Sequence, residues 1–200
     1  MKDSSLTKSI SYKDFKKEVL NDYKTIVISR EASLLGRKEV LSGKAKFGIF
    51  GDGKELPQVA MSKVFEKGDF RSGYYRDQTF MFSIKELSVE QFFAGLYANT
   101  NFDEEPMSGG RQMGSHFSTV LVDENGEFKD LPNQYNISSD ISPTSGQMPR
   151  LLGLAMASKL FRTAKFNSKN LSTNGNEVAW GTIGNACLLY TSPSPRDGSE

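Results

Sequence analysis

The sequence predicts an α/β fold in which a parallel sheet is flanked by helices, with a helical extension at the N-terminus. The main observation is a helical pattern over residues 146–161, whose leucines and alanines we expect to pack closely on a buried surface. A short polar link and an apolar strand over residues 177–183, which we expect to be buried, follow it. The strand ends in a glycine turn at residues 184–186, and this order of elements is typical of a parallel sheet. Two further helical patterns lie near the N-terminus, within residues 1–45. We therefore expect a helical extension over residues 1–45 and an α/β domain over residues 46–186.

The first helices are predicted from their caps and from the spacing of their apolar residues. Ser11 can cap a helix whose apolar residues follow at spacings near four. A second helical pattern covers residues 26–41. Gly43 is expected to end this helix, because glycine readily adopts the backbone conformation found just after a helix. A third pattern covers residues 55–65, with Pro57 in its first turn, where its missing N–H is tolerated.

The middle of the chain alternates turns, one capped helix and a long irregular region. Three glycines and an aspartate predict a turn over residues 48–53, and a capping box at residues 88–91 opens a further helix. Residues 101–145 are mostly irregular, with a predicted hairpin or excursion around residues 120–128. Such a long loop region in a compact domain is usually either functional or disordered. We favour the functional interpretation, since this region contains the single histidine, His116.

The composition excludes several classes of function. Lys plus Arg is 25 and Asp plus Glu is 24, a balance that gives no electrostatic footprint for nucleic acid or an anionic membrane. No apolar stretch approaches the roughly 18–20 residues that span a bilayer. One cysteine, Cys187, excludes an internal disulfide, and with one histidine it cannot complete a zinc site. Because the N-terminus also lacks the apolar part of a secretory signal, we expect a cytoplasmic protein.

Two segments carry residues suited to binding a phosphorylated cofactor. Residues 74–77 place Arg76 beside Tyr75, and an arginine next to aromatic rings can clamp a phosphate while a ring supports a flat cofactor. The alternative is an exposed arginine beside core tyrosines. Residues 109–117 surround His116 with glycines, which let backbone approach a ligand, and the histidine can act as an acid or base near neutral pH. The alternative is a surface loop with a structural histidine.

Two further segments lie at the start of a helix and at the end of the strand. Ser142 and Thr144 precede the helix over residues 146–161, where hydroxyls can meet a polar ligand, although capping the helix is their commoner role. Residues 184–186 follow the strand, at the position where diphosphates bind in α/β sheets. Within that turn, Asn185 can offer an amide oxygen to magnesium.

The order and spacing of these four segments resemble the alpha subunit of the decarboxylating component of 2-oxo acid dehydrogenase complexes, of the branched-chain type. The resemblance runs from about residue 23 to residue 186. It implies a thiamine-diphosphate-binding fold, truncated within its diphosphate and metal motif. The residues that the resemblance assigns to the cofactor are Tyr75, Arg76, Ser142, Thr144, Gly184, Asn185 and Ala186.

Two motifs depart from the family's pattern. Asn185 stands in place of an acid and Ala186 in place of a glycine, as in a bacterial branch in which the alpha and beta halves are fused. The metal, Mg²⁺, would keep an oxygen ligand from Asn185 but lose one formal charge. Ile141 and Gly146 stand where a monovalent-cation loop would carry hydroxyls, so we expect no such ion here.

The resemblance also implies the reaction and the partners. The parent enzyme would bind thiamine diphosphate and Mg²⁺, decarboxylate a branched-chain 2-oxo acid and pass the acyl group to a lipoyl domain of the acyltransferase component. The beta half or subunit would complete the site, and His116 is the candidate catalytic residue. We expect the chain alone to be inactive. The alternatives are a pyruvate-specific enzyme of the same family and a non-catalytic α/β binding module.

Residues 187–200 differ in character from the rest of the chain. They follow the predicted strand without a turn and end in a proline-rich polar sequence. They resemble the translated adapter sequence found at the ends of assembled gene fragments. We therefore expect a non-native tail in which Cys187 has no function, and we exclude it from the fold prediction.

Overall fold

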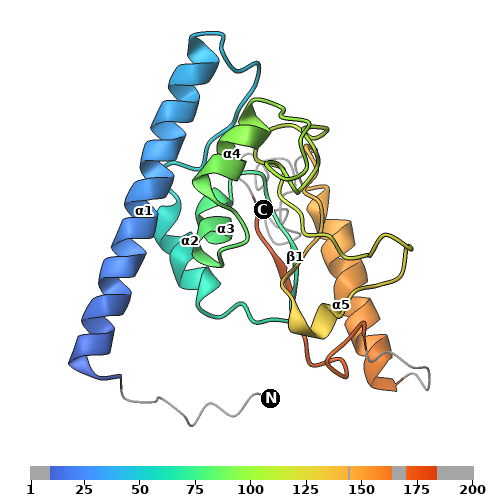
Figure 1. Cartoon of the computed structure of the whole chain (residues 1–200). Helices are drawn as coiled ribbons and strands as arrows, with labels where there is room; N and C mark the ends of the chain where they lie inside the picture. Colours follow the sequence, from blue (N-terminus) through green and yellow to red (C-terminus); the bar gives the residue numbers. More distant parts are fainter. Residues whose placement is uncertain (1–9, 144, 164–169, 184–200) are drawn as a thin grey trace, which may run out of the picture.

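The computed structural model describes residues 10–143, 145–163 and 170–183. Short strands alternate with helices along this part of the chain (Figure 1). In chain order the elements are α1 (Tyr12–Leu41), α2 (Glu55–Ser62), β1 (Phe70–Ser72), α3 (Gln78–Ser83), α4 (Val89–Leu96), the 3-10 helix η1 (Leu131–Asn133), β2 (Asn136–Ile137), α5 (Gln147–Thr163) and β3 (Ala179–Gly181).

The three strands form a parallel sheet in the order β2-β1-β3. Helix α5 packs against β1 and β3, while α1, α2, α3 and α4 pack against one another on the other side of β1 (Figure 1). The predicted parallel sheet flanked by helices is thereby confirmed. The strand predicted over residues 177–183 is shorter than expected, and its partly exposed edge position replaces the full burial that we predicted.

Helix α1 is one continuous helix, whereas the sequence suggested two. The Ser11 hydroxyl caps it by accepting from the Asp14 N–H at 3.2 Å, and Gly43 follows its end with a φ of 77°, as predicted. Nothing between the two predicted stretches interrupts it, because no glycine or proline occurs there. The face of α1 that packs inward carries small residues: Ser29, Ala32, Ser33 and Gly36.

Many large apolar residues on helices α1 and α5 are exposed. Phe15, Val19, Leu20, Leu34, Leu35 and Leu41 of α1 are exposed. Helix α5 covers the sheet with one narrow stripe, so Leu151 and Leu154 are half-buried while Leu152 is 63% exposed, contrary to the close packing we expected. Periodicity identifies a helix, but it does not show how wide a surface will cover it.

The core between the helices and the sheet is built largely from aromatic rings. Phe65 lies at its centre, edge-on to Phe80 at 5.2 Å between ring centroids and edge-on to Trp180 at 6.2 Å. It also stacks on Tyr135 at 5.5 Å. We call this cluster the aromatic core; its buried members are Ala32, Ala45, Phe50, Phe65, Phe80, Met81, Ile84, Leu87, Phe92, Leu96, Phe117 and Ile137.

Two local predictions in the middle of the chain are confirmed. The capping box that opens α4 is present in full, with the Ser88 hydroxyl and the Gln91 side chain each accepting a backbone N–H. The excursion around residues 120–128 contains an antiparallel bridge between Val122 and Phe128. Across the described residues, no helix is long and apolar enough to cross a membrane.

Candidate cofactor site

The turn between β1 and α3 carries an arginine held against two tyrosine rings. The Tyr74 and Tyr75 ring centroids lie 4.0 Å apart, and the Arg76 guanidinium carbon lies 5.7 Å and 5.8 Å from them. The Tyr74 hydroxyl donates to the Tyr75 hydroxyl at 2.7 Å. Burial, reinforced by this hydrogen bond, raises the pKa of Tyr74 to about 12, so Tyr74 keeps its proton at neutral pH.

The backbone of this turn is held by neighbouring elements. Gln58 of α2 donates from Nε2 to the carbonyl oxygen of Arg76 at 2.9 Å. The loop before α2 approaches the same carbonyl so closely that a Cβ at Gly51 would lie 2.3 Å from it. Only glycine fits there, which explains one residue of the glycine-rich turn that the sequence predicted. The position of Arg76 is therefore set by α2 and its preceding loop.

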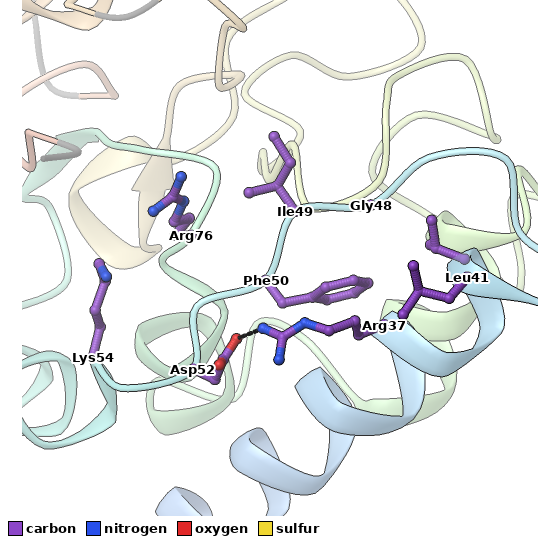
Figure 2. A pocket seen from close by; sticks show the side chains of 9 residues that line it. Arg37, Leu41, Gly48, Ile49, Phe50, Asp52, Lys54 and Arg76 are labelled. Atoms are coloured by element: carbon purple, nitrogen blue, oxygen red, sulfur yellow. Dashed lines mark hydrogen bonds and ion pairs between the residues drawn. The ribbon is translucent and has the colours of Figure 1, made fainter. Parts of the chain in front are cut away.

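Arg76 lies at the wall of a cavity of about 430 Å³. Figure 2 shows Arg76 and Lys54 on one side of it and Leu41 and Arg37 on the other, with Phe50 between them. Arg37 pairs with Asp52 at 2.5 Å, whereas Lys54 and Arg76 have no carboxylate partner among the described residues. The cavity therefore combines an apolar surface with two unpaired positive charges.

The Arg76 guanidinium also has unused hydrogen-bonding capacity. Its Nε atom is buried and has no partner among the residues that the structure describes. A buried donor without a partner is unfavourable, and such groups are often completed by a ligand. The structure thus favours the binding interpretation of Arg76 over that of an exposed arginine, since the side chain is half-buried and aimed at a cavity.

Two of the other predicted segments meet the tyrosine turn through His116. The imidazole stacks on the Tyr75 ring at 5.8 Å between centroids and 12° between planes. Its Nε2 lies 2.9 Å from the Ser142 hydroxyl oxygen. Residues far apart in the sequence, Arg76, Tyr75, His116 and Ser142, thus form one continuous row. The Ser142 hydroxyl contacts His116, and its binding of a ligand stays a prediction.

The glycines before His116 have a structural role. Gly109 and Gly110 have φ values of 58° and 70°, and a Cβ on Gly110 would lie 2.5 Å from the Ala98 carbonyl oxygen. The buried Glu105 carboxylate accepts the backbone N–H groups of Met107, Ser108 and Gly110 at 2.9–3.2 Å. The backbone donors of Met107, Ser108 and Gly110 are thus held by Glu105 within the loop, and the approach of this backbone to a ligand stays a prediction. Nothing in the sequence singled out that glutamate.

Three buried charged residues beside the site were not predicted from the sequence. Arg71 of β1 pairs with Asp77 at 2.7 Å and with Asp140 at 3.2 Å, and the side chains are 1%, 5% and 0% exposed. We call these three residues the Arg71 network. Burial raises the pKa of Asp140, although the Arg71 charge opposes this shift. The only signal in the sequence was an arginine inside a short apolar strand.

Four predicted site residues, Thr144, Gly184, Asn185 and Ala186, lie outside the described residues. The last described residues before that motif, Thr182 and Ile183, line a second cavity of about 190 Å³ together with Tyr74 and Asp77. Lys54 borders both cavities. Among residues 10–143, 145–163 and 170–183, no group of three or more His, Cys, Asp or Glu side chains is arranged to hold a metal ion.

Two comparisons with known proteins identify the family of the chain. The family model described as dehydrogenase E1 component matches residues 23–187. The chain is also similar to the 2-oxoisovalerate dehydrogenase subunit alpha of Bacillus subtilis (strain 168), with 28% identity over 148 residues. That match covers 72% of this chain and 38% of the relative, so the chain spans well under half of the relative's length.

Proposed function

This chain belongs to the dehydrogenase E1 component family, and we propose that it forms the thiamine-diphosphate-binding part of an enzyme that decarboxylates a branched-chain 2-oxo acid. The observation that carries the proposal is the row of Arg76, Tyr75, His116 and Ser142 beside a cavity with two unpaired cations. Family membership also supports a thiamine-diphosphate-binding fold for the parallel sheet. The acyl product would pass to a lipoyl domain, and a beta half or subunit would complete the site.

The residues present fit the diphosphate end of the cofactor. Arg76 offers an unpartnered Nε and an uncompensated charge, and Lys54 adds a second charge on the same side of the cavity. Guanidinium groups bind phosphate oxygens through parallel charge-assisted hydrogen bonds. When bound, thiamine diphosphate supplies the electron sink that decarboxylation needs. Arg76 would hold its diphosphate, while Tyr75 and Ser142 would orient it.

His116 is the candidate acid–base group. Its stacking on Tyr75 fixes the plane of the ring, and the contact between its Nε2 and the Ser142 hydroxyl fixes the rotation of the ring within that plane. A histidine held in this way can accept or donate a proton at a defined position. We propose that His116 contacts the 2-oxo acid or the reacting part of the cofactor.

The remaining proposed site residues are Thr144, before α5, and the motif at residues 184–186, after β3. Thr144, Gly184 and Ala186 would contribute backbone contacts to the cofactor, and Asn185 would offer its amide oxygen to Mg²⁺, a cation that prefers oxygen ligands. Thr182 and Ile183, which lead into this motif, line a cavity next to Tyr74. The two residues that precede the motif therefore lie next to the tyrosine turn.

Two observations support a branched-chain acid as the proposed substrate. The relative is named for 2-oxoisovalerate, and the cavity beside Arg76 is lined by apolar side chains, including those of Val40, Leu41, Ile49 and Phe50. A branched aliphatic acid matches such a surface. The single cysteine and the absence of a membrane-spanning helix among the described residues are compatible with our proposal of a cytoplasmic enzyme.

The test is an assay of the full-length enzyme that contains this chain. We expect release of carbon dioxide from 3-methyl-2-oxobutanoate that depends on thiamine diphosphate and Mg²⁺. Arg76→Met should raise the dissociation constant for thiamine diphosphate about tenfold or more, because a charge-assisted hydrogen bond contributes about 1.5–3 kcal/mol. Arg162→Met, which removes an arginine of the last turn of α5 that does not line the cavity, should leave that constant unchanged.

Four results would contradict the proposal in different ways. A preference for pyruvate would change the substrate, and no decarboxylation of either acid would remove the catalytic assignment. Equal binding by the Arg76→Met variant would remove the diphosphate assignment. For the 200-residue chain without a beta half we expect no decarboxylation and weak or absent cofactor binding, so micromolar Mg²⁺-dependent binding in a calorimeter would contradict that part.

A further inference from the structure

We propose that Arg71 is the positioning residue that holds all the segments of the cofactor site in register, through Asp77 and Asp140. The proposal rests on the proposed function for its meaning, because it concerns the same site. Its test does not depend on cofactor binding. Arg71 is the middle residue of β1, and its side chain is 1% exposed. It contacts neither cavity, so its role is to place the residues that do.

The first link joins Arg71 to the tyrosine turn. Its Nη2 donates to Asp77 Oδ2 at 2.7 Å and to the Tyr74 carbonyl oxygen at 3.2 Å. Asp77 Oδ2 also accepts the Tyr74 N–H at 3.1 Å. The ends of the turn that carries Tyr75 and Arg76 are thus tied to one guanidinium. Gly73 makes room for it, since a Cβ there would lie 1.9 Å from the guanidinium carbon.

The second link joins Arg71 to both partners of the histidine–serine contact. Arg71 Nη1 donates to Asp140 Oδ1 at 3.2 Å, and the other oxygen of Asp140 accepts the Phe117 N–H at 3.3 Å. Phe117 directly follows His116, and Asp140 lies two residues before Ser142. The Asp140 carboxylate therefore fixes the loop of the histidine and the loop of the serine against the same arginine.

The third link reaches the end of β3. The Thr182 hydroxyl donates to Asp77 Oδ2 at 2.5 Å. Thr182 lies two residues before Gly184, where the proposed diphosphate motif begins. Four segments that are distant in the sequence are therefore connected through one arginine and two carboxylates. No other described arginine has two buried carboxylate partners.

A lysine cannot reproduce this arrangement. The planar guanidinium directs separate N–H groups at Asp77, at Asp140 and at the Tyr74 carbonyl, whereas an ammonium is a compact group on a flexible chain. Arg71→Lys keeps the positive charge and loses the fixed geometry. The Asp140→Asn variant keeps a balanced Arg71–Asp77 pair in nearly the same volume but weakens the link to Phe117 and to the serine loop.

The chain contains its own reporters for this test, a single histidine and a single tryptophan. His116 lies in the site, so the NMR resonances of its ring C–H groups report the stacking on Tyr75 and the contact with Ser142. Trp180 lies against Phe65, so its fluorescence reports the aromatic core. In Arg71→Lys we expect a native Trp180 emission, together with His116 resonances that broaden and move toward their positions in the urea-unfolded chain.

The matched control is Lys63→Met, which removes a partly exposed cation that also has two carboxylate partners, Glu18 at 2.5 Å and Asp22 at 2.8 Å. It should leave the His116 resonances in place. Unchanged His116 resonances in a folded Arg71→Lys chain would overturn the proposal. If that variant does not fold, Asp140→Asn decides by the same criterion, and loss of the fold in both would show a global role instead. Failure of the proposed function would appear separately, as an absence of thiamine diphosphate binding by the full-length enzyme.

Discussion

The aromatic core and the Arg71 network are both buried, yet they stabilise the molecule in different ways. In the aromatic core, rings such as Phe65 and Phe92 contact several neighbours at once, and the favourable free energy follows the apolar area removed from water. In the Arg71 network each contact has a direction, and a lost partner leaves a buried charge. The first region supplies stability, and the second supplies the positions that the site needs.

The strands of the sheet are short, and this explains why buried polar side chains are needed around them. The strands contain three, two and three residues, so backbone pairing alone supplies few hydrogen bonds. Side chains supply others. Asn136 donates to the carbonyls of Gly68 and Leu131, and Asp69 accepts the Val178 N–H and the Trp180 indole N–H. These buried polar side chains thus add hydrogen bonds to a sheet whose own backbone pairing is too short to be stable alone.

The largest effect should come from the aromatic core. Phe92 is 3% exposed and contacts Phe50, Phe82 and Phe93, so Phe92→Ala should lower the free energy of unfolding by about 3–5 kcal/mol. Urea denaturation followed by Trp180 fluorescence measures this change. The exposed Phe15 is the control, since Phe15→Ala should change stability by less than about 0.5 kcal/mol. Altered His116 resonances in the folded Phe92→Ala chain would break the separation between the two regions.

A smaller effect should follow from removing a polar residue that extends the sheet. Asp69 is 2% exposed, and Asp69→Ala would leave the Val178 N–H and the Trp180 indole N–H without their acceptor. We expect a loss of about 2–3 kcal/mol together with an altered Trp180 emission. Asp103→Ala, on an exposed loop, should change neither quantity. An equal loss in both variants would mean that the short sheet does not depend on this carboxylate.

The smallest effect should appear only in alkaline solution. The pKa of Tyr74 is raised by burial and by its bond to Tyr75 to about 12, above its usual value of 10. The stabilising contribution of neutral Tyr74 is therefore complete below pH 10 and lost as the pH rises through 12, with a slope of at most about 1.4 kcal/mol per pH unit. Denaturation at a series of pH values measures this slope. Tyr74→Phe should flatten it, whereas Tyr12→Phe, at an exposed position, should not.

The sequence predicted the parts of the site that are recognised by residue type and order. Tyr75, Arg76, His116 and Ser142 were identified from their segments, and the structure brings them together. The roles of these residues stay predictions, as do those of Thr144 and residues 184–186. The parallel sheet was also predicted, because an apolar strand after a helix leaves few other arrangements.

The Arg71 network could not be predicted in the same way. A charged residue in a strand is usually interpreted as exposed, and only the fold shows that Arg71 is neutralised by the nearby Asp77 and by Asp140 from a distant segment. The apolar residues of α1 are a second case. Their spacing correctly predicted a helix, but it did not show that small residues such as Ser29 and Gly36 form the contact. Burial depends on what the rest of the chain places nearby.

The close approach of Gly73 to the Arg71 guanidinium has a consequence for how this sequence can change over generations. An alanine at position 73 would occupy the volume of the guanidinium, and a shorter residue at position 71 would leave the space beside Gly73 empty. Neither position can vary freely while the other is retained. Substitutions at positions 71 and 73 should therefore occur together among related sequences. A sequence that lacks the arginine should also tolerate residues other than glycine at position 73.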